Sequence, residues 1–387
     1  MFTFLAPTKI IFGVNSVSKL SEEFSRLGGG RMFIVTDPVV EKAGMVDAVK
    51  NELGSDFDTV TYNRVEPEPR LELAEDLASS ARELRPNVIL GIGGGSVLDL
   101  AKIASVMVTN EGSVSDYCQG ILNIETFKSK GQPTILIPTT AGTGSEVSNT
   151  SMLVAGGRKI FLRSRLLFPE IAIVDPRMTI TMPQKVTAAT GIDALAHAIE
   201  GLMSTNSSPL TDALALTSVQ LISQNLAKAY QDGSDINART SMSLAAVMAG
   251  LVLNAGMVVG HSIAYTIATR YNLNHGVSCA IPLPYVMAYN LSACIDKLRR
   301  VATAFGQNVE GLTAEVAAEK SVEAVKQLVQ EVGVPTNLKS IGVQQAILPL
   351  LAAECLEKYP RPNNPVPLSA QEAVALYKRI WEGRPFG

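Results

Sequence analysis

The sequence predicts an α/β domain with a mostly parallel sheet in its first half and an all-helical domain in its second half. Short apolar runs alternate with helix-like segments up to about residue 180. Alternation of this kind is typical of a parallel sheet covered by helices on both faces. After Met182-Pro183 the chain is rich in alanine, leucine and methionine at helical spacing, with no long strand pattern. We therefore expect domains at residues 1–180 and 181–387.

Elements of the first domain are expected at apolar runs and amphipathic segments between turn residues. Strands are predicted at 31–36, 87–92, 134–138 and 171–174, and helices at 71–84 and 96–108. Residues 1–13 lack the basic start of a signal peptide and are expected to form an edge strand.

The second domain is predicted to contain helices throughout. They are expected at 186–203, 209–230, 237–254, 257–269, 277–290, 296–304, 313–332, 343–355 and 370–382. The stretch 240–269 contains no Asp, Glu, Lys or Arg and is long enough to span a bilayer. Its glycines and polar residues, and the symmetric flanks Arg239 and Arg270, indicate instead one or two helices buried in the domain.

The composition of the 387-residue chain narrows the class of protein. Hydrophobic residues make up 47%, charged residues 18%, and the net charge is −3. These values indicate a well-buried globular protein, with no basic run to bind nucleic acid and no expected membrane partner. No two of the four cysteines have Cys-x-x-Cys spacing, so we expect free thiols and a cytoplasmic location.

A glycine loop follows the predicted strand at 87–92. The segment VILGIGGGS at 88–96 passes from strand through glycines to a helix start, where backbone N–H groups and the helix dipole favour an anion. This pattern predicts phosphate binding; the alternative is a tight turn without a ligand. Asp37, after the strand at 31–36, could bind ribose hydroxyls and favour NAD over NADP. Its alternative role is a helix cap before Pro38.

All three histidines of the chain fall in one metal-ligand pattern. They are His197, His261 and His275, and Asp193 precedes the first by four residues, so the two share a helix face. One carboxylate and three imidazoles suit a divalent metal such as Fe²⁺ or Zn²⁺. The alternative is three separate core or surface histidines. The sequence contains neither the Gly-x-Ser-x-Gly elbow of serine hydrolases nor the Gly-Lys-Ser/Thr phosphate-binding loop, so it does not indicate either of these chemistries.

Several longer motifs are spread over essentially the whole chain. They are FxxPxxIxFG at 4–13, GGGSxxDxxK at 93–102, PTTAGTGSE at 138–146, ATGIDALAHAIE at 189–200, His261, HG at 275–276 and LPYVMxYN at 283–290. Together they resemble the iron-containing, or group III, alcohol dehydrogenases. The resemblance implies a dehydroquinate synthase-like architecture, with an N-terminal nucleotide domain and a C-terminal helical domain that holds the metal.

The resemblance also implies roles for individual residues. It implies that Fe²⁺, or alternatively Zn²⁺, is held by Asp193, His197, His261 and His275. It implies that NAD is contacted by Gly94, Gly95, Ser96, Asp99, Thr139, Thr140, Thr143 and Lys159, with Asp37 setting the NAD preference. Homodimers or higher homo-oligomers are implied as well.

The chain departs from the family at Tyr265. Many members carry a further histidine four residues after the one that matches His261, and here that position is Tyr265. We expect Tyr265 and His275 at the reacting centre, with Tyr265 donating a hydrogen bond to the substrate; the alternative is that Tyr265 only packs there.

The expected function is therefore a metal-dependent NAD(H) oxidoreductase that interconverts a small alcohol and its aldehyde or ketone by hydride transfer. One alternative is a dehydrogenase or transhydrogenase for hydroxyacids. An alternative of another class is a non-redox lyase of the dehydroquinate synthase type, and a third is a nucleotide-binding regulatory protein without activity. The sequence identifies neither the substrate nor the choice between iron and zinc.

Overall fold

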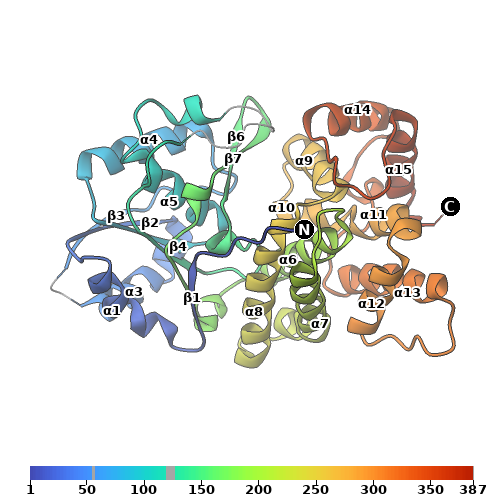
Figure 1. The fold of residues 1–387 in the computed structure, drawn as a ribbon, viewed down its shortest axis with the longest axis horizontal. Helices are drawn as coiled ribbons and strands as arrows, with labels where there is room; N and C mark the ends of the chain where they lie inside the picture. The colour runs from blue at the N-terminus through green and yellow to red at the C-terminus, as the bar shows by residue number, and fades with distance from the viewer. Residues whose placement is uncertain (55–56, 119–126, 387) are drawn as a thin grey trace. The chain divides into compact units, whose positions relative to one another are not determined.

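The computed structural model describes residues 1–54, 57–118 and 127–386, and the chain divides into two compact units (Figure 1). The α/β unit is Ala6–Met182. The helical unit is Pro183–Gly387 together with Met1–Leu5.

The α/β unit contains a six-stranded parallel sheet in the order β1-β8-β5-β4-β2-β3. Its strands are β1 (Lys9–Phe12), β2 (Arg31–Thr36), β3 (Asp58–Tyr62), β4 (Val88–Gly93), β5 (Thr134–Pro138) and β8 (Ile171–Val174). The strands predicted at 31–36, 134–138 and 171–174 are confirmed, and β4 is shifted by one residue. The edge strand expected over residues 1–13 covers only Lys9–Phe12, and Met1–Leu5 belong to the helical unit. Strand β3 was missed because its sequence, DTVTY, is mostly polar and lies at the opposite edge.

Both faces of this sheet are covered by helices, as the apolar strands require. Phe33 and Val35 pack with α4 and α5 on one face. Met32 and Ile34, which alternate with them along β2, pack with α1 and α3 on the other. The helices are α1 (Leu20–Arg26), α2 (Pro38–Lys42), α3 (Met45–Leu53), α4 (Leu71–Leu84) and α5 (Gly95–Met107).

The chain reverses its direction across the sheet between β2 and β4. Strand β2 is followed by β3 on one side, whereas β4 is followed by β5 on the other. The hydroxyl of Thr36, at the end of β2, donates to the carbonyl of Ile92 in β4 at 2.8 Å. Parallel sheets bind ligands outside the carboxyl ends of the strands at such a reversal. Both Asp37 and the glycine loop begin there.

A two-stranded antiparallel hairpin, β6 (Thr150–Ala155) and β7 (Arg158–Arg163), completes the α/β unit. Its two-residue turn consists of Gly156 and Gly157, with φ of 55° and 70°. Positive φ at both positions is what a tight hairpin turn needs, and glycine adopts it without steric cost. Arg158, Lys159 and Arg163 all lie on strand β7 of this hairpin.

The helical unit consists of ten α-helices in its described residues. They are α6 (Gln184–Met203), α7 (Pro209–Gln231), α8 (Ile236–Val252), α9 (Val259–Tyr271), α10 (His275–Ala280), α11 (Leu283–Asn290), α12 (Ile295–Ala304), α13 (Ala314–Glu331), α14 (Leu348–Lys358) and α15 (Ala370–Glu382). The prediction of one helix over 277–290 is wrong, because Pro282 lacks the N–H that a continuous helix needs.

The uncharged stretch 240–269 forms two helices, α8 and α9, as predicted. Gly256, with φ of 71°, separates them. Among the described residues one segment, Ile236–Ala255, is long and apolar enough to cross a membrane, but 56% of its most apolar window is buried inside the structure. The buried guanidinium of Arg239 donates to Thr187 Oγ1 at 2.9 Å, which ties α8 to α6. The segment therefore has the burial of a core helix.

Candidate active site

Three helices of the helical unit each contribute a pair of residues spaced i, i+4. Helix α6 carries Asp193 and His197, α9 carries His261 and Tyr265, and α10 carries His275. The second residue of the α10 pair is Cys279, which the sequence did not single out. Residues four apart lie on one helix face, so three faces converge on one point.

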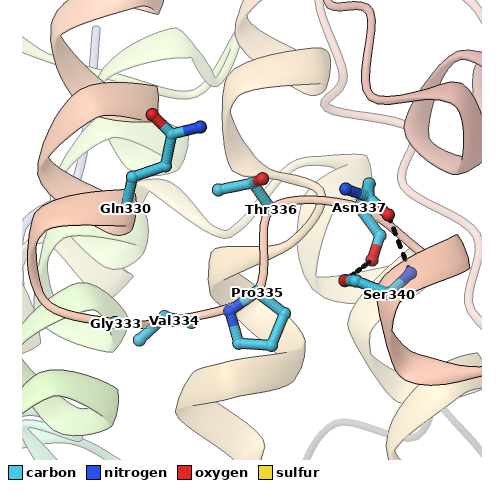
Figure 2. A pocket seen from close by; sticks show the side chains of 7 residues that line it. All are labelled: Gln330, Gly333, Val334, Pro335, Thr336, Asn337 and Ser340. Atoms are coloured by element: carbon cyan, nitrogen blue, oxygen red, sulfur yellow. Dashed lines mark hydrogen bonds between the residues drawn. The ribbon is translucent and has the colours of Figure 1, made fainter.

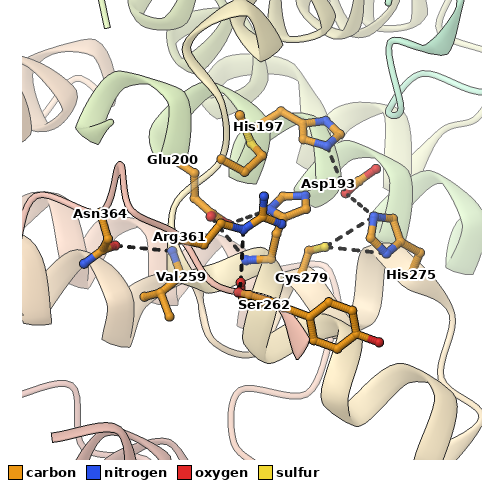
Figure 3. Close-up of polar contacts among 12 residues, drawn as sticks. Asp193, His197, Glu200, Val259, Ser262, His275, Cys279, Arg361 and Asn364 are labelled. Atoms are coloured by element: carbon orange, nitrogen blue, oxygen red, sulfur yellow. Dashed lines mark hydrogen bonds and ion pairs between the residues drawn. The ribbon is translucent and has the colours of Figure 1, made fainter. Parts of the chain in front are cut away.

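The donor atoms at this point are close enough to share one metal ion (Figure 3). Ligand atoms of Asp193, His261, His275 and Cys279 all lie within 4.8 Å of one another. Asp193 Oδ1 is 3.6 Å from His275 Nε2 and 3.9 Å from His197 Nε2. The structure thus brings together Asp193, His261 and His275 of the predicted ligand set with the sulfur of Cys279, and it places His197 next to Asp193 but outside that group.

A buried carboxylate fixes the orientation of His261. Nδ1 of His261 donates to Glu200 Oε1 at 2.7 Å, and the His261 backbone N–H donates to Glu200 Oε2 at 3.2 Å. Because an ionised carboxylate only accepts, this bond places the hydrogen on Nδ1 and leaves the lone pair on Nε2. Carboxylates commonly orient metal-binding imidazoles in this way.

The chemistry of the donor set fits a divalent cation. Asp193 Oδ1 and His261 Nε2 are buried and have no hydrogen-bond partner among the described residues. Burying such atoms without a partner is costly, and a metal ion would satisfy both. Burial alone would raise the pKa of the Asp193 carboxyl, but the charges of His197, His275 and His261 hold that pKa below its usual value. The surroundings of Asp193 therefore favour its ionised, negatively charged carboxylate.

Two glycines make room for this arrangement. A Cβ on Gly260 would lie 2.5 Å from Glu200 Oε1, and a Cβ on Gly276 would lie 2.1 Å from the carbonyl oxygen of Ala189. Only glycine lets α9 and α10 approach α6 this closely. Close packing against α6 therefore explains why glycine follows His275 at position 276.

Tyr265 is buried beside the donor cluster. Its ring stacks on His275 at a centroid distance of 5.9 Å and meets His261 edge-on at 6.1 Å. The Arg361 guanidinium lies 5.8 Å from the centre of the Tyr265 ring, and its Nε donates to Ser262 Oγ at 3.0 Å. Burial raises the pKa of the Tyr265 phenol well above its usual value, so Tyr265 stays a hydrogen-bond donor.

The glycine loop of the α/β unit lies against the threonines that the sequence grouped with it. A Cβ on Gly95 would be 2.6 Å from Thr143 Cγ2, and one on Gly94 would be 3.4 Å from Thr140 Cγ2. The backbone N–H of Thr139 donates to the Gly93 carbonyl at 2.9 Å. Helix α5 begins at Gly95, so the first-turn N–H groups of Gly95 and Ser96 lie at the reversal point of the sheet.

A buried polar cluster supports this loop from below. Asp99 accepts from Ser145 Oγ at 2.6 Å and from the Met152 N–H at 2.8 Å, and it pairs with Lys102 at 3.1 Å. Burial lowers the pKa of the Lys102 ammonium and raises the pKa of the neighbouring Glu146 to about 7. The Asp99 carboxylate is thus engaged with side-chain and backbone groups of neighbouring segments.

Asp37 and Lys159 are also engaged with protein groups. Asp37 Oδ1 accepts from the N–H groups of Val39 and Val40 at 2.8 and 2.9 Å, so it caps α2, which was the alternative to ribose binding. Lys159, on β7, is buried and forms an ion pair with Glu68.

Sequence reasoning missed three residues of the metal region: Glu200, Cys279 and Arg361. A signal existed for the first two, since Glu200 is seven residues after Asp193 and Cys279 four after His275, on the same helix faces. Arg361 follows α14, 100 residues after His261, and no local pattern connects them. Only the packing of the chain places it there.

A separate hollow lies after α13 (Figure 2). It is lined by Gln330, Gly333, Val334, Pro335, Thr336, Asn337 and Ser340. Asn337 Oδ1 accepts from the Ser340 N–H at 2.8 Å, so these polar groups are partly engaged with each other. The lining contains no charged side chain, histidine or cysteine, so this hollow lacks groups for metal binding or proton transfer.

Comparisons with known proteins agree with this geometry. Residues 7–176 match the model of iron-containing alcohol dehydrogenases, and residues 187–381 match the model of the C-terminal part of the Fe-containing alcohol dehydrogenase family. The chain is similar to long-chain-alcohol dehydrogenase 1 of Geobacillus thermodenitrificans, at 38% identity over 96% of this chain and 94% of that protein. It is similar to the NAD-dependent methanol dehydrogenase of Bacillus methanolicus, at 31% identity over 98% of this chain and 99% of that protein.

The fold has a solved counterpart. The structure of a 1,3-propanediol oxidoreductase superposes with a TM-score of 0.94 at 34% identity, over 98% of this chain and 100% of that chain. The family models together span both units of the structure. The chain belongs to the iron-containing alcohol dehydrogenase family.

Proposed function

We propose that this protein is a metal-dependent NAD(H) oxidoreductase that interconverts a small alcohol and its aldehyde or ketone. The observation that carries this proposal is the buried donor cluster on α6, α9 and α10, in a chain of the iron-containing alcohol dehydrogenase family. The use of NAD is supported by a relative named as an NAD-dependent methanol dehydrogenase.

The helical unit would hold the metal. Asp193, His197, His261 and His275 supply the donors, with Fe²⁺ or alternatively Zn²⁺ as the ion. When bound, the ion supplies Lewis-acid chemistry that lowers the pKa of an alcohol hydroxyl, while NAD supplies the hydride acceptor. The carboxylate of Asp193 compensates positive charge at the centre, and Glu200 keeps Nε2 of His261 directed at it.

Tyr265 is the proposed hydrogen-bond donor to the substrate oxygen. All three histidines of the chain belong to the donor set, with His275 also placed at the reacting centre, so no imidazole is left to transfer a proton. The phenol of Tyr265 is buried, keeps its hydrogen and stacks on His275. The alcohol proton would then pass to a hydroxyl of the nucleotide ribose or to water.

The α/β unit would bind the dinucleotide at the reversal point of its sheet. We propose that the phosphates contact the backbone after β4, and that Asp37 binds the ribose hydroxyls. Asp99 and Lys159 are proposed nucleotide contacts as well, held in place by their ion pairs with Lys102 and Glu68. The proposed contact residues are Gly94, Gly95, Ser96, Thr139, Thr140 and Thr143.

One observation favours a second candidate, oxidation or transhydrogenation of small hydroxyacids. The Arg361 guanidinium lies beside the Tyr265 ring, so a positive charge lies next to the proposed substrate position. A carboxylate on the substrate would pair with this charge. A lyase reaction without net redox change has no such support.

An anaerobic substrate screen tests these proposals. The protein would be reconstituted with Fe²⁺ or Zn²⁺ and given alcohols, diols and 2-hydroxyacids with NAD and NADP in parallel. NADH formation with an uncharged alcohol supports the dehydrogenase. Turnover of an oxoacid paired with a hydroxyacid, without added nucleotide, would show the transhydrogenase instead, and the absence of both NADH formation and oxoacid turnover would refute both.

We further propose that the enzyme acts in the cytoplasm as a homodimer or higher homo-oligomer. The four cysteines, all within the described residues, form no disulfide, which suits a reducing compartment. Light scattering during gel filtration would measure the assembly, and a monomer would refute that part of the proposal.

A further inference from the structure

We propose that the sulfur of Cys279 is an additional donor of the metal centre and that it shifts the preference of this centre from iron toward zinc. This inference rests on the metal site proposed above and concerns a residue outside the predicted ligand set. Three observations support it: the position of Cys279, the distances around its sulfur and the charges of the buried donors.

The spacing of Cys279 from His275 is the same as the spacing of His197 from Asp193. Cys279 follows His275 by four residues on α10, as His197 follows Asp193 on α6, so the sulfur shares the face that carries the imidazole. The residue is fully buried, and its side chain is labelled beside His275 and Asp193 in Figure 3. The sulfur therefore has no exposure to bulk solvent.

The distances match those that a shared ion imposes. A metal–sulfur bond of about 2.3 Å and a metal–nitrogen bond of about 2.05 Å at the tetrahedral angle put the two donor atoms about 3.6 Å apart. Cys279 Sγ lies 3.6 Å from His275 Nε2. The donor atoms of Asp193, His261, His275 and Cys279 lie within 4.8 Å of one another, so all four face one point.

The charge balance of the site also favours a sulfur donor. Asp193 Oδ1 and His261 Nε2 are buried without hydrogen-bond partners among the described residues, and Asp193 supplies one negative charge. Among the direct donors, a Cys279 thiolate would supply a second negative charge, so that the two anionic donors match a divalent ion while the Glu200 carboxylate stays paired with the His261 ring. On binding the ion, the Cys279 thiol would release its proton to solvent and donate a lone pair, with no change in oxidation state.

The expected consequence is a change in metal choice. Thiolate is a softer donor than imidazole or carboxylate, and it suits zinc better than a site built from oxygen and nitrogen alone. The alternative is that the thiol only makes a weak hydrogen bond to His275, in which case its removal leaves the metal preference unchanged.

Cobalt substitution separates these cases without relying on turnover. The full-length protein, freed of metal and loaded with Co²⁺, should show a sulfur-to-cobalt charge-transfer band in the near ultraviolet together with visible d–d bands. The charge-transfer band should be lost in Cys279→Ser and Cys279→Ala and retained in Cys294→Ser, a buried cysteine whose sulfur contacts the Met203 carbonyl. Elemental analysis after competition between Fe²⁺ and Zn²⁺ should show the zinc-to-iron ratio falling about tenfold in Cys279→Ser.

Each outcome decides the matter. Visible d–d bands without a charge-transfer band in the unaltered protein would overturn the role of Cys279 while leaving the metal site in place, even if the Cys279 variants fail to fold. A failure to bind Co²⁺ at all would overturn the metal site and this inference together. An unchanged zinc-to-iron ratio in a folded Cys279→Ser protein would refute the effect on metal choice.

Discussion

His261 and Glu200 are joined by two hydrogen bonds, one from the ring and one from the backbone of the same residue. The ring bond is 2.7 Å and the backbone bond 3.2 Å, and both partners are buried. We expect Glu200→Ala to weaken metal affinity by about 10- to 100-fold, because nothing then holds Nε2 of His261 toward the centre. Chelator competition monitored by elemental analysis measures this.

Two further variants sharpen that test. Glu200→Gln keeps an acceptor for the His261 ring but places its amide N–H₂ against the His261 backbone N–H, which removes the second hydrogen bond. Metal affinity should therefore fall less in Glu200→Gln than in Glu200→Ala. Gly260→Ala places a Cβ 2.5 Å from Glu200 Oε1 and should resemble Glu200→Ala. The exposed Glu357→Gln is the control. Equal metal affinity in all four proteins would contradict the orienting role.

Removing the Tyr265 hydroxyl should slow turnover without loss of metal. Tyr265→Phe is expected to lower kcat about tenfold, the effect of one lost hydrogen bond of about 1.4 kcal/mol, with an unchanged metal content. Tyr271→Phe, at the end of the same helix, should have no effect. An unaltered rate over the whole pH range in Tyr265→Phe would reject the role of Tyr265 as hydrogen-bond donor to the substrate.

The two roles of Asp37 can be separated by one conservative change. Asp37→Asn keeps an oxygen to cap α2, so stability should change by less than about 0.5 kcal/mol, whereas Asp37→Ala should cost about 1 kcal/mol. Both changes remove the carboxylate, so the preference for NAD over NADP should fall in both. If KM for NADP is the same in all three proteins, Asp37 is only a cap.

The glycine loop offers a matched pair of substitutions. Gly95→Ala would bring a Cβ to 2.6 Å from Thr143, whereas Gly94→Ala would bring one to 3.4 Å from Thr140. We expect Gly95→Ala to lower the free energy of unfolding by about 1–3 kcal/mol and to weaken NADH binding, because the threonine must move. The effect of Gly94→Ala should be smaller in thermal melts and fluorescence titrations, and the reverse order would contradict this packing.

Burial of Glu146 makes stability depend on pH in a defined window. Burial raises the pKa of its carboxyl to about 7 from the ordinary 4.5. Between these values the unfolded chain releases the proton and the folded chain keeps it, so stability should fall as pH rises from about 4.5 to 7. The full loss is about 3 kcal/mol.

Glu146→Gln should lack this loss, since it carries no titrating group. Urea unfolding at several pH values across the window compares the two proteins. Parallel stability curves for the wild type and Glu146→Gln would show that the carboxyl of Glu146 does not titrate differently on folding. Stability that rises with pH only in the wild type would contradict the sign.

The sequence by itself determined the fold class and most elements of the α/β unit. Strands β2, β5 and β8 and helix α4 have the predicted bounds, because apolar runs between turn residues carry a strong local signal. It also indicated a metal chemistry, since all three histidines and Asp193 follow a ligand pattern. Family membership then followed from motifs spread over both units.

Only the tertiary structure decided which further groups face the metal donors. Glu200, Cys279 and Arg361 come from α6, α10 and the segment after α14, and their side chains meet through helix packing that no short pattern encodes. The contacts of Asp99 with Ser145 and of Lys159 with Glu68 were likewise invisible, because each pair is separated by many residues of chain. Local periodicity specifies which face a residue occupies, whereas its neighbours across that face depend on the whole fold.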